Sequence, residues 1–223
     1  MIKYHKSKCR IATRSEYEQQ KYAYEVLIFI KLHSMLRSTI SLLYICCVLS
    51  SSGQDNQISW QHDFQLDWSD FQQRVGQGGV FKAFTFSGIQ YEVRDLGGIV
   101  AIEVESYFLP GESWAFQDYL SDELLAHEEL HFHITEIYAR KMRRDFTKFE
   151  IDIEEFASNK MIEELKTKYN SLYDEMELLQ KRYDSETDHG AGSQAQIDWE
   201  EWIDVQLKMT NAYSKMNHET TSH

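Results

Sequence analysis

The segment 124–134 limits the fold of this chain more than any other stretch of its sequence. It contains the pattern His-Glu-x-x-His, formed by His127, Glu128 and His131, and neither glycine nor proline interrupts the run. A helix is the natural backbone for such a run, and residues four apart then lie on one helical face. The flanking apolar residues are Leu124, Leu125, Ala126, Leu130 and Ile134. The segment therefore predicts a helix that packs into a hydrophobic core.

Two imidazoles at this spacing can bind one zinc ion, each at about 2.0–2.1 Å. Glu128 follows the first histidine and would reach a water activated by the metal, so it can act as a general base. Charged and imidazole groups on a buried helix are costly unless they are paired or bind a metal. We therefore predict His127 and His131 as zinc ligands and Glu128 as the catalytic base. The alternative is a charged helix face that binds no metal.

Catalytic zinc usually takes three protein ligands and leaves one position for water. The preferred third ligand is His189, which lies in a polar loop after the second long predicted helix. A hairpin of two helices would return this loop to the histidine pair. The alternatives are Glu154 or Glu155, from an acidic run, and an exposed His189 that binds nothing. A metzincin carries glycine and histidine where this chain has Ile134 and Ile137, so that class is excluded.

The residues next to His189 offer further groups for such a site. Asp184, Glu186 or Asp188 could accept a hydrogen bond from an imidazole and so orient it, and the sequence does not choose among them. Tyr183, at the end of the second long predicted helix, is a candidate to stabilise the oxyanion of a hydrolysis reaction.

The order of the predicted elements indicates an α+β domain. Residues 83–93 and 99–108 are rich in β-branched and aromatic residues and are joined by a glycine-containing turn, which predicts an antiparallel pair. A further strand is expected near residues 60–68. Helices follow at about 117–146, 151–183 and 193–216. We thus expect a small antiparallel sheet followed by a C-terminal bundle of about three helices, the first carrying His-Glu-x-x-His. The strand at 99–107 would offer an edge to an extended peptide.

The N-terminal quarter of the chain has the features of a targeting segment. From Met35 a short basic stretch, an apolar stretch of about ten residues and a run of small residues follow one another, as in a secretory signal peptide. We assign residues 1–34 to a doubtful leader or over-extended start, 35–53 to a signal peptide or membrane anchor, 54–216 to a zincin-like metallopeptidase domain and 217–223 to a disordered tail. This predicts a secreted or periplasmic protein, or alternatively one anchored in the membrane by the apolar segment.

Charge and cysteine content exclude several classes of function. The net charge is −13, and residues 1–47 contribute +5 from eight Lys/Arg against three Glu, which leaves −18 for the remainder. With so large a negative charge, the chain after residue 47 offers no broad basic face to nucleic acid or to an anionic membrane. All three cysteines lie in residues 1–47, so a metal site in the body must use histidine and carboxylate ligands.

Several other motifs accompany His-Glu-x-x-His. They are Trp60…Trp68-x-Asp70-Phe71, Glu112-Ser113-Trp114, Glu136-x-x-Ala139-Arg140 and Tyr183-Asp184-x-x-Thr187-x-His189-Gly190. With them, residues 58–210 resemble a bacterial domain-of-unknown-function family described as predicted secreted zinc-dependent proteases. The resemblance implies a secreted or periplasmic location and a peptidase-like zinc site, and it supplies no particular substrate.

Together these patterns predict a zinc-dependent metallopeptidase whose partner is a peptide or protein substrate. Its Zn²⁺ would be held by His127, His131 and His189, with Glu128 moving the proton from water to the leaving amine. Two other hypotheses stay open at this point. One is a non-catalytic envelope module whose zinc is structural or lost, and the other is a zinc hydrolase acting on a different amide, such as that of a cell wall.

Overall fold

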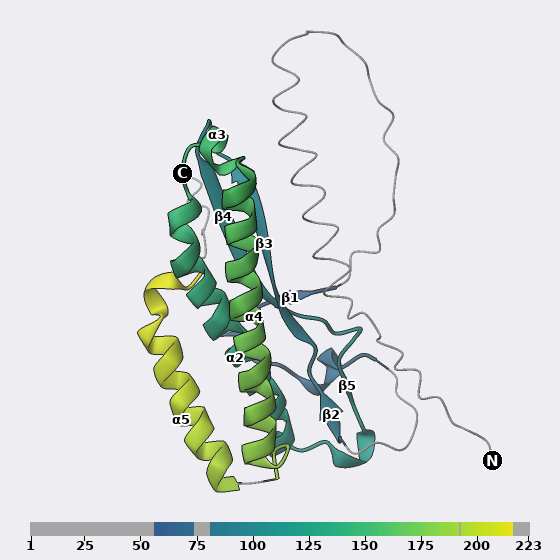
Figure 1. Cartoon of the computed structure of the whole chain (residues 1–223). Helices are drawn as coiled ribbons and strands as arrows, with labels where there is room; N and C mark the ends of the chain where they lie inside the picture. The colour runs from purple at the N-terminus through teal and green to yellow at the C-terminus, as the bar shows by residue number, and fades with distance from the viewer. Residues whose placement is uncertain (1–55, 74–80, 192, 216–223) are drawn as a thin grey trace, which may run out of the picture. The chain divides into compact units, whose positions relative to one another are not determined.

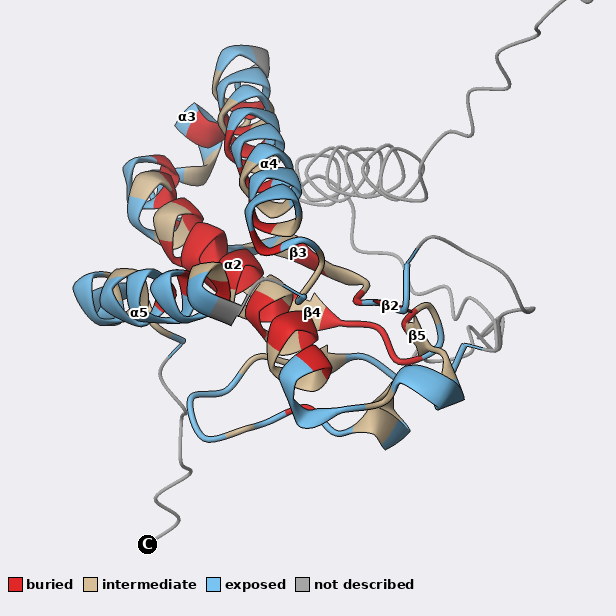
Figure 2. Ribbon diagram, turned by 90° about the horizontal axis from the view of Figure 1, so that it is seen from below, coloured by how far each residue is buried: buried red, intermediate tan, exposed pale blue. Residues whose placement is uncertain are grey.

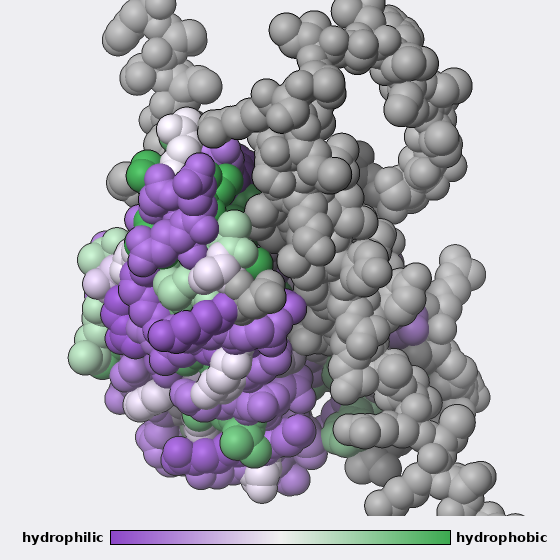
Figure 3. All heavy atoms as spheres, turned by 45° about the horizontal axis from the view of Figure 1, so that its top comes forward, coloured by the Kyte–Doolittle hydropathy of each residue, from purple (hydrophilic) through white to green (hydrophobic). Residues whose placement is uncertain are grey.

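The computed structural model describes residues 56–73, 81–191 and 193–215 (Figure 1). The predicted leader at 1–34, the signal or anchor at 35–53 and the tail at 217–223 lie outside the described residues. Within the described ranges, no helix is both long and apolar enough to span a membrane. One face of this part of the molecule is mostly hydrophilic, with separate hydrophobic areas between the polar side chains (Figure 3).

The main sheet has three antiparallel strands in the order β1-β4-β3. Strand β1 spans Ile58–Ser59, β3 spans Ser87–Asp95 and β4 spans Val100–Phe108. The two long strands pair along their whole length, from Ser87 opposite Phe108 to Asp95 opposite Val100. This confirms the antiparallel pair expected from the sequence.

The expectation that residues 99–107 present an edge to a peptide is wrong. Strand β4 lies in the middle of the sheet, between β1 and β3. Its start is also covered, because the Val100 amide donates to the Ile151 carbonyl and Ile99 forms a bridge with Asp152. Edge strand β3 is in turn contacted by Tyr169, whose hydroxyl donates to the Ile89 carbonyl at 2.6 Å.

A second, two-stranded sheet lies apart from the first. Strands β2 (Ala83–Phe84) and β5 (Trp114–Ala115) are antiparallel, with Phe84 opposite Trp114. The predicted strand at 83–93 therefore belongs to two sheets, because its first two residues pair with β5 and its later residues pair with β4.

Four helices follow the strands, which confirms the α+β class. They are α2 (Asp122–Phe146), α3 (Ile153–Phe156), α4 (Asn159–Thr187) and α5 (Ser193–Met209). Ser121 caps the start of helix α2, because its hydroxyl accepts a hydrogen bond from the Leu124 amide. The helix expected at 151–183 is divided, because Asp152 caps the short α3 and Ser158 caps a new start for α4.

Helix α2 is the centre of the fold. It contacts β3, β4, α4 and α5, and Figure 2 shows the buried residues concentrated along it. Ile134, Ile137, Ala139 and Met142 are completely buried on this helix. The sequence segment with the metal-binding pattern therefore folds as a core helix, as its apolar neighbours predict.

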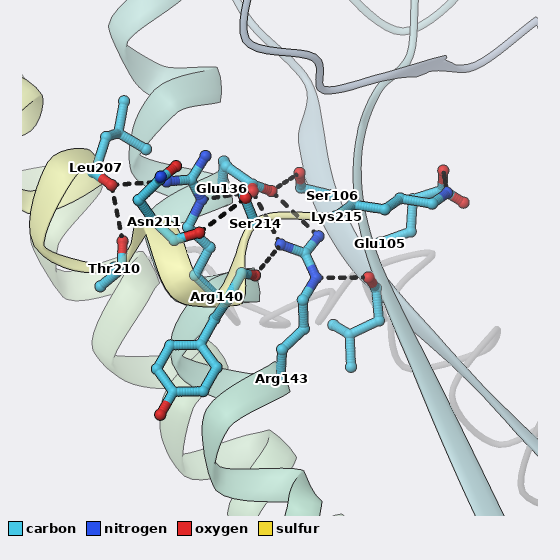
Figure 4. Close-up of polar contacts among 12 residues, drawn as sticks. Glu105, Ser106, Glu136, Arg140, Arg143, Leu207, Thr210, Asn211, Ser214 and Lys215 are labelled. Carbon is cyan, nitrogen blue, oxygen red and sulfur yellow. Dashed lines mark hydrogen bonds and ion pairs between the residues drawn. The ribbon is translucent and has the colours of Figure 1, made fainter. Parts of the chain in front are cut away.

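A buried ion network joins the second half of α2 to the sheet and to the C-terminal segment (Figure 4). Glu136 accepts a hydrogen bond from Ser106 on β4 and pairs with Arg140 and Arg143, both at 2.8 Å. Arg140 also donates to the Leu207 carbonyl on α5 at 2.7 Å. Because the carboxylate of Glu136 is fully engaged here, the network fixes α5 against α2.

Candidate metal centre

Three side chains from α2 and α4 converge on one point. Their potential ligand atoms, from His127, His131 and Asp184, all lie within 4.8 Å of one another. The Nε2 atoms of His127 and His131 lie 3.3 Å and 3.0 Å from the same oxygen, Oδ1 of Asp184. The helical spacing of the two histidines and the return of α4 along α2 bring the three groups together. This group could hold a metal ion.

The ring of His131 is held from its other nitrogen by Gln180 on α4. The amide nitrogen of Gln180 donates to the His131 carbonyl at 2.9 Å and to the Thr135 hydroxyl at 3.2 Å. A carbonyl only accepts, so the Oε1 atom of Gln180 must face His131 Nδ1, which lies 2.5 Å away. His131 therefore donates from Nδ1, and its Nε2, which faces Asp184 Oδ1, is the atom that could bind a metal.

Gln196 on α5 holds His127 in the same way. Its Oε1 lies 3.2 Å from His127 Nδ1, while its amide nitrogen donates to the Glu200 carboxylate at 3.4 Å. This orientation again makes Nδ1 the donor, so that Nε2, on the side of Asp184, is the atom that could bind a metal. Such contacts fix the tautomer and orientation of imidazoles that bind metals. Sequence analysis missed both glutamines.

Tyr183 forms the inner wall of the site. It is completely buried, and its ring stacks on His127 at 4.6 Å and meets the edge of His131 at 4.9 Å. Its hydroxyl lies within donating distance of the His127 carbonyl and of Gln196 Oε1. Burial raises the pKa of Tyr183 well above its ordinary value, so the hydroxyl keeps its proton. This placement argues against the expected oxyanion role, because the hydroxyl proton is already directed at buried acceptors.

The electrostatics of the site favour a cation. Burial by itself would raise the pKa of Asp184, but hydrogen bonds and charge interactions with His127 and His131 outweigh it, and the pKa lies well below the usual range. Burial likewise lowers the pKa of His131, but Asp184 and Glu128 outweigh that effect and raise it. The carboxylate of Asp184 is therefore ionised, and the site attracts positive charge between its ligand atoms.

Glu128 is the one buried group in the site whose polar atoms are not all satisfied. Its side chain is 4% exposed, and within the described residues its Oε2 has no hydrogen-bond partner. The charge of Glu128 acts on both His131 and Tyr183, so the carboxylate lies close to the metal-binding group. A buried carboxylate oxygen without a partner is costly, and a cation or an ordered water at the site would remove that cost.

His189 lies beside this group but outside it. Its Nδ1 is 3.4 Å from Asp184 Oδ1, and its side chain is 42% exposed. A left-handed turn ends α4 here, with φ of 50° at Asp188, 52° at His189 and 83° at Gly190. The turn returns the chain to α2, as expected, and a Cβ on Gly190 would lie 3.1 Å from the His127 side chain. Its role as third ligand stays a prediction.

The other acidic candidates are placed elsewhere. Glu186 pairs with Arg182 at 2.7 Å and accepts from the Trp199 indole at 3.0 Å. Glu154 and Glu155 are exposed on α3, outside the group that could hold a metal. Gln180 and Asp184 are four residues apart and therefore lie on the same face of α4. A search of the sequence of this helix for polar residues at that spacing would have identified both as candidates for the site.

One family model matches the part of the chain that carries this site. Residues 110–190 match the model of a family described as "Bacterial protein of unknown function (DUF922)". This confirms the resemblance to a bacterial family of unknown function. The segment that matches DUF922 contains every candidate ligand and Glu128, whereas Gln196 lies beyond it. Neither the curated proteins nor the solved structures contain a match to the chain.

Proposed function

We propose that this protein is a zinc-dependent metallopeptidase of the cell envelope or exterior. The observation that carries the proposal is the convergence of His127 Nε2 and His131 Nε2 on one carboxylate oxygen of Asp184, with both Nδ1 atoms held by glutamine oxygens. Two imidazoles and a carboxylate suit zinc, and three protein ligands leave one coordination position for water. The extracytoplasmic location rests on the signal-like sequence from Met35 alone.

The roles of the residues follow from this geometry. A zinc ion held there would supply Lewis-acid activation of water and of the substrate carbonyl. Glu128, next in sequence to His127, takes the proton from water and delivers it to the leaving amine. Gln180, Gln196 and Tyr183 position the two imidazoles and do not touch the substrate.

The structure suggests two candidates for the third ligand. Asp184 is favoured, because its Oδ1 is the atom on which both imidazoles converge. His189 contacts the same oxygen from the exposed side, so it is either the third ligand, with Asp184 orienting it, or the group that orients Asp184.

A second candidate function is a non-catalytic envelope module with structural zinc. The proximity of His189 and Asp184 favours it, because binding by both would fill all four positions of a tetrahedral ion and leave none for water. Activity on a substrate with the metal retained distinguishes the two functions.

The ligand set is tested by metal content. Wild-type protein should bind one zinc per chain by elemental analysis, and Asp184→Asn should bind far less. Glu186→Gln is the matched control, because it removes a carboxylate two residues away that pairs with Arg182. If His189→Ala loses zinc and Asp184→Asn keeps it, His189 is the third ligand.

The catalytic role is tested with Glu128→Gln. This variant should retain zinc and lose hydrolysis of casein or of a peptide library by at least about a hundredfold, the usual contribution of a general base. If Glu128→Gln cleaves these substrates as fast as the wild type, the proposed mechanism is wrong.

A further inference from the structure

An exposed group of aromatic rings lies on and beside the two-stranded sheet. We call it the aromatic patch, and it consists of Phe81, Phe84, Trp114, Phe116 and Tyr119. Phe81 and Phe84 are nearly half exposed, and Tyr119 is 54% exposed. Three of the rings contact one another, since Phe84 stacks on Trp114 at 6.2 Å and Trp114 meets Phe116 at 5.2 Å.

Folding alone does not explain this patch. In β2 the side chain of Ala83 is buried, and that of Phe84 therefore points to the opposite, exposed face. A sheet of two residues per strand has no core of its own to stabilise. Single exposed apolar residues are common on protein surfaces. A group of adjacent exposed rings, in contrast, is typical of a surface that binds a ligand or a partner protein.

The patch reaches the metal centre through Phe81, and Thr85, next to Phe84 in the chain, makes a second contact with the same region. The ring of Phe81 meets the edge of the His189 imidazole at 4.8 Å, and His189 lies 3.4 Å from Asp184 Oδ1. At the other end of β2, the hydroxyl of Thr85 donates to the backbone carbonyl of Glu128 at 3.1 Å. The residues on either side of β2 thus contact a candidate ligand and the backbone of the proposed base.

We propose that the aromatic patch binds a side chain of the substrate, and that the preferred substrate is a peptide with an aromatic or large aliphatic residue adjacent to the scissile bond. This proposal rests on the metallopeptidase function proposed above. Aromatic rings bind such side chains by apolar contact and by edge-to-face or offset stacking. Lys82, which lies 5.9 Å from the ring centroid of Tyr119, borders the patch with a positive charge.

The test separates binding from hydrolysis. The zinc-loaded Glu128→Gln protein is titrated with labelled peptides that differ at one position, Phe against Gly, and binding is followed by fluorescence anisotropy. We expect the Phe peptide to bind at least about tenfold more tightly. Phe81→Ala in the same background should lower that preference to about threefold or less, since one aromatic contact accounts for a factor of about ten. Zinc content should not change.

Leu96→Ala is the matched control, because Leu96 is 65% exposed in the turn between β3 and β4 and is not part of the patch. It should leave the preference unchanged. Equal binding of the Phe and Gly peptides, or a preference that survives Phe81→Ala combined with Phe84→Ala, would overturn the proposal even if the wild type hydrolyses peptides. Conversely, if the Phe peptide binds preferentially but the wild type hydrolyses no peptide, the peptidase function is refuted. The binding of an aromatic side chain by the patch is then still supported. Self-association that Phe84→Ala abolishes, with unchanged peptide preference, would assign the patch to a second copy of the chain instead.

Discussion

Replacing Gln180 should weaken zinc binding without removing a ligand. Its Oε1 accepts from His131 Nδ1 at 2.5 Å, and its amide nitrogen anchors it to the His131 carbonyl and the Thr135 hydroxyl. Gln180→Met has a similar length and makes none of these bonds. Loss of such an orienting contact lowers metal affinity by about 10–100-fold, or about 1.4–2.8 kcal/mol. The metal-free protein should also lose about 3 kcal/mol of stability, at about 1 kcal/mol per hydrogen bond.

The assay is competition for zinc against a chromogenic chelator at fixed pH, with unfolding in urea measured in parallel. Gln180→Glu is the matched control, because its carboxylate still accepts from His131 Nδ1 but cannot donate to the His131 carbonyl. It should lose stability while keeping wild-type zinc affinity or exceeding it. If Gln180→Met binds zinc within twofold of the wild type, His131 is not oriented by Gln180 and the tautomer inferred above is wrong.

Three further predictions concern the surroundings of the site. Gly190→Ala should cost about 1–2 kcal/mol in urea unfolding and reduce zinc affinity, because residue 190 has positive φ and a Cβ there would crowd His127. Glu136→Gln should destabilise the protein by about 3–5 kcal/mol, because it leaves Arg140 and Arg143 buried without a countercharge, and calorimetry would measure this. Burial raises the pKa of Asp145, but hydrogen bonds from Arg144 and Lys168 outweigh it and lower the pKa, so its stabilising contribution is present above about pH 4 and is lost as the pH falls further. Asp145→Asn should therefore flatten the pH dependence of stability below that point.

The elements that could be predicted from the sequence are those that depend on local patterns. The helix around His127 and His131 was predictable because an uninterrupted apolar periodicity surrounds them, and the strand pair because two β-rich runs flank a glycine turn. The break between α3 and α4 was missed because it depends on the caps at Asp152 and Ser158, which interrupt an otherwise continuous helical pattern. The position of β4 in the middle of the sheet depends on β1, whose two residues are too short for a periodic signal.

The site shows the same division between local and distant information. His127, Glu128 and His131 share one helix, so their spacing fixes their geometry. Gln180 and Gln196 act from α4 and α5, and no sequence pattern links them to the histidines. Their role emerges only once the helix packing is known.

The way in which helix α4 ends favours one of the two candidates for the proposed third ligand. Asp184 is still within the regular helix, so its side chain is held on the face that meets α2. His189 follows the left-handed residue Asp188, beyond the last helical turn, and its ring is 42% exposed. Fixing an exposed side chain at a metal costs more conformational entropy than using one already ordered by a helix. Asp184 is therefore the candidate whose side chain is already ordered for metal binding, and His189 contacts both Asp184 and Phe81 of the aromatic patch from the exposed side.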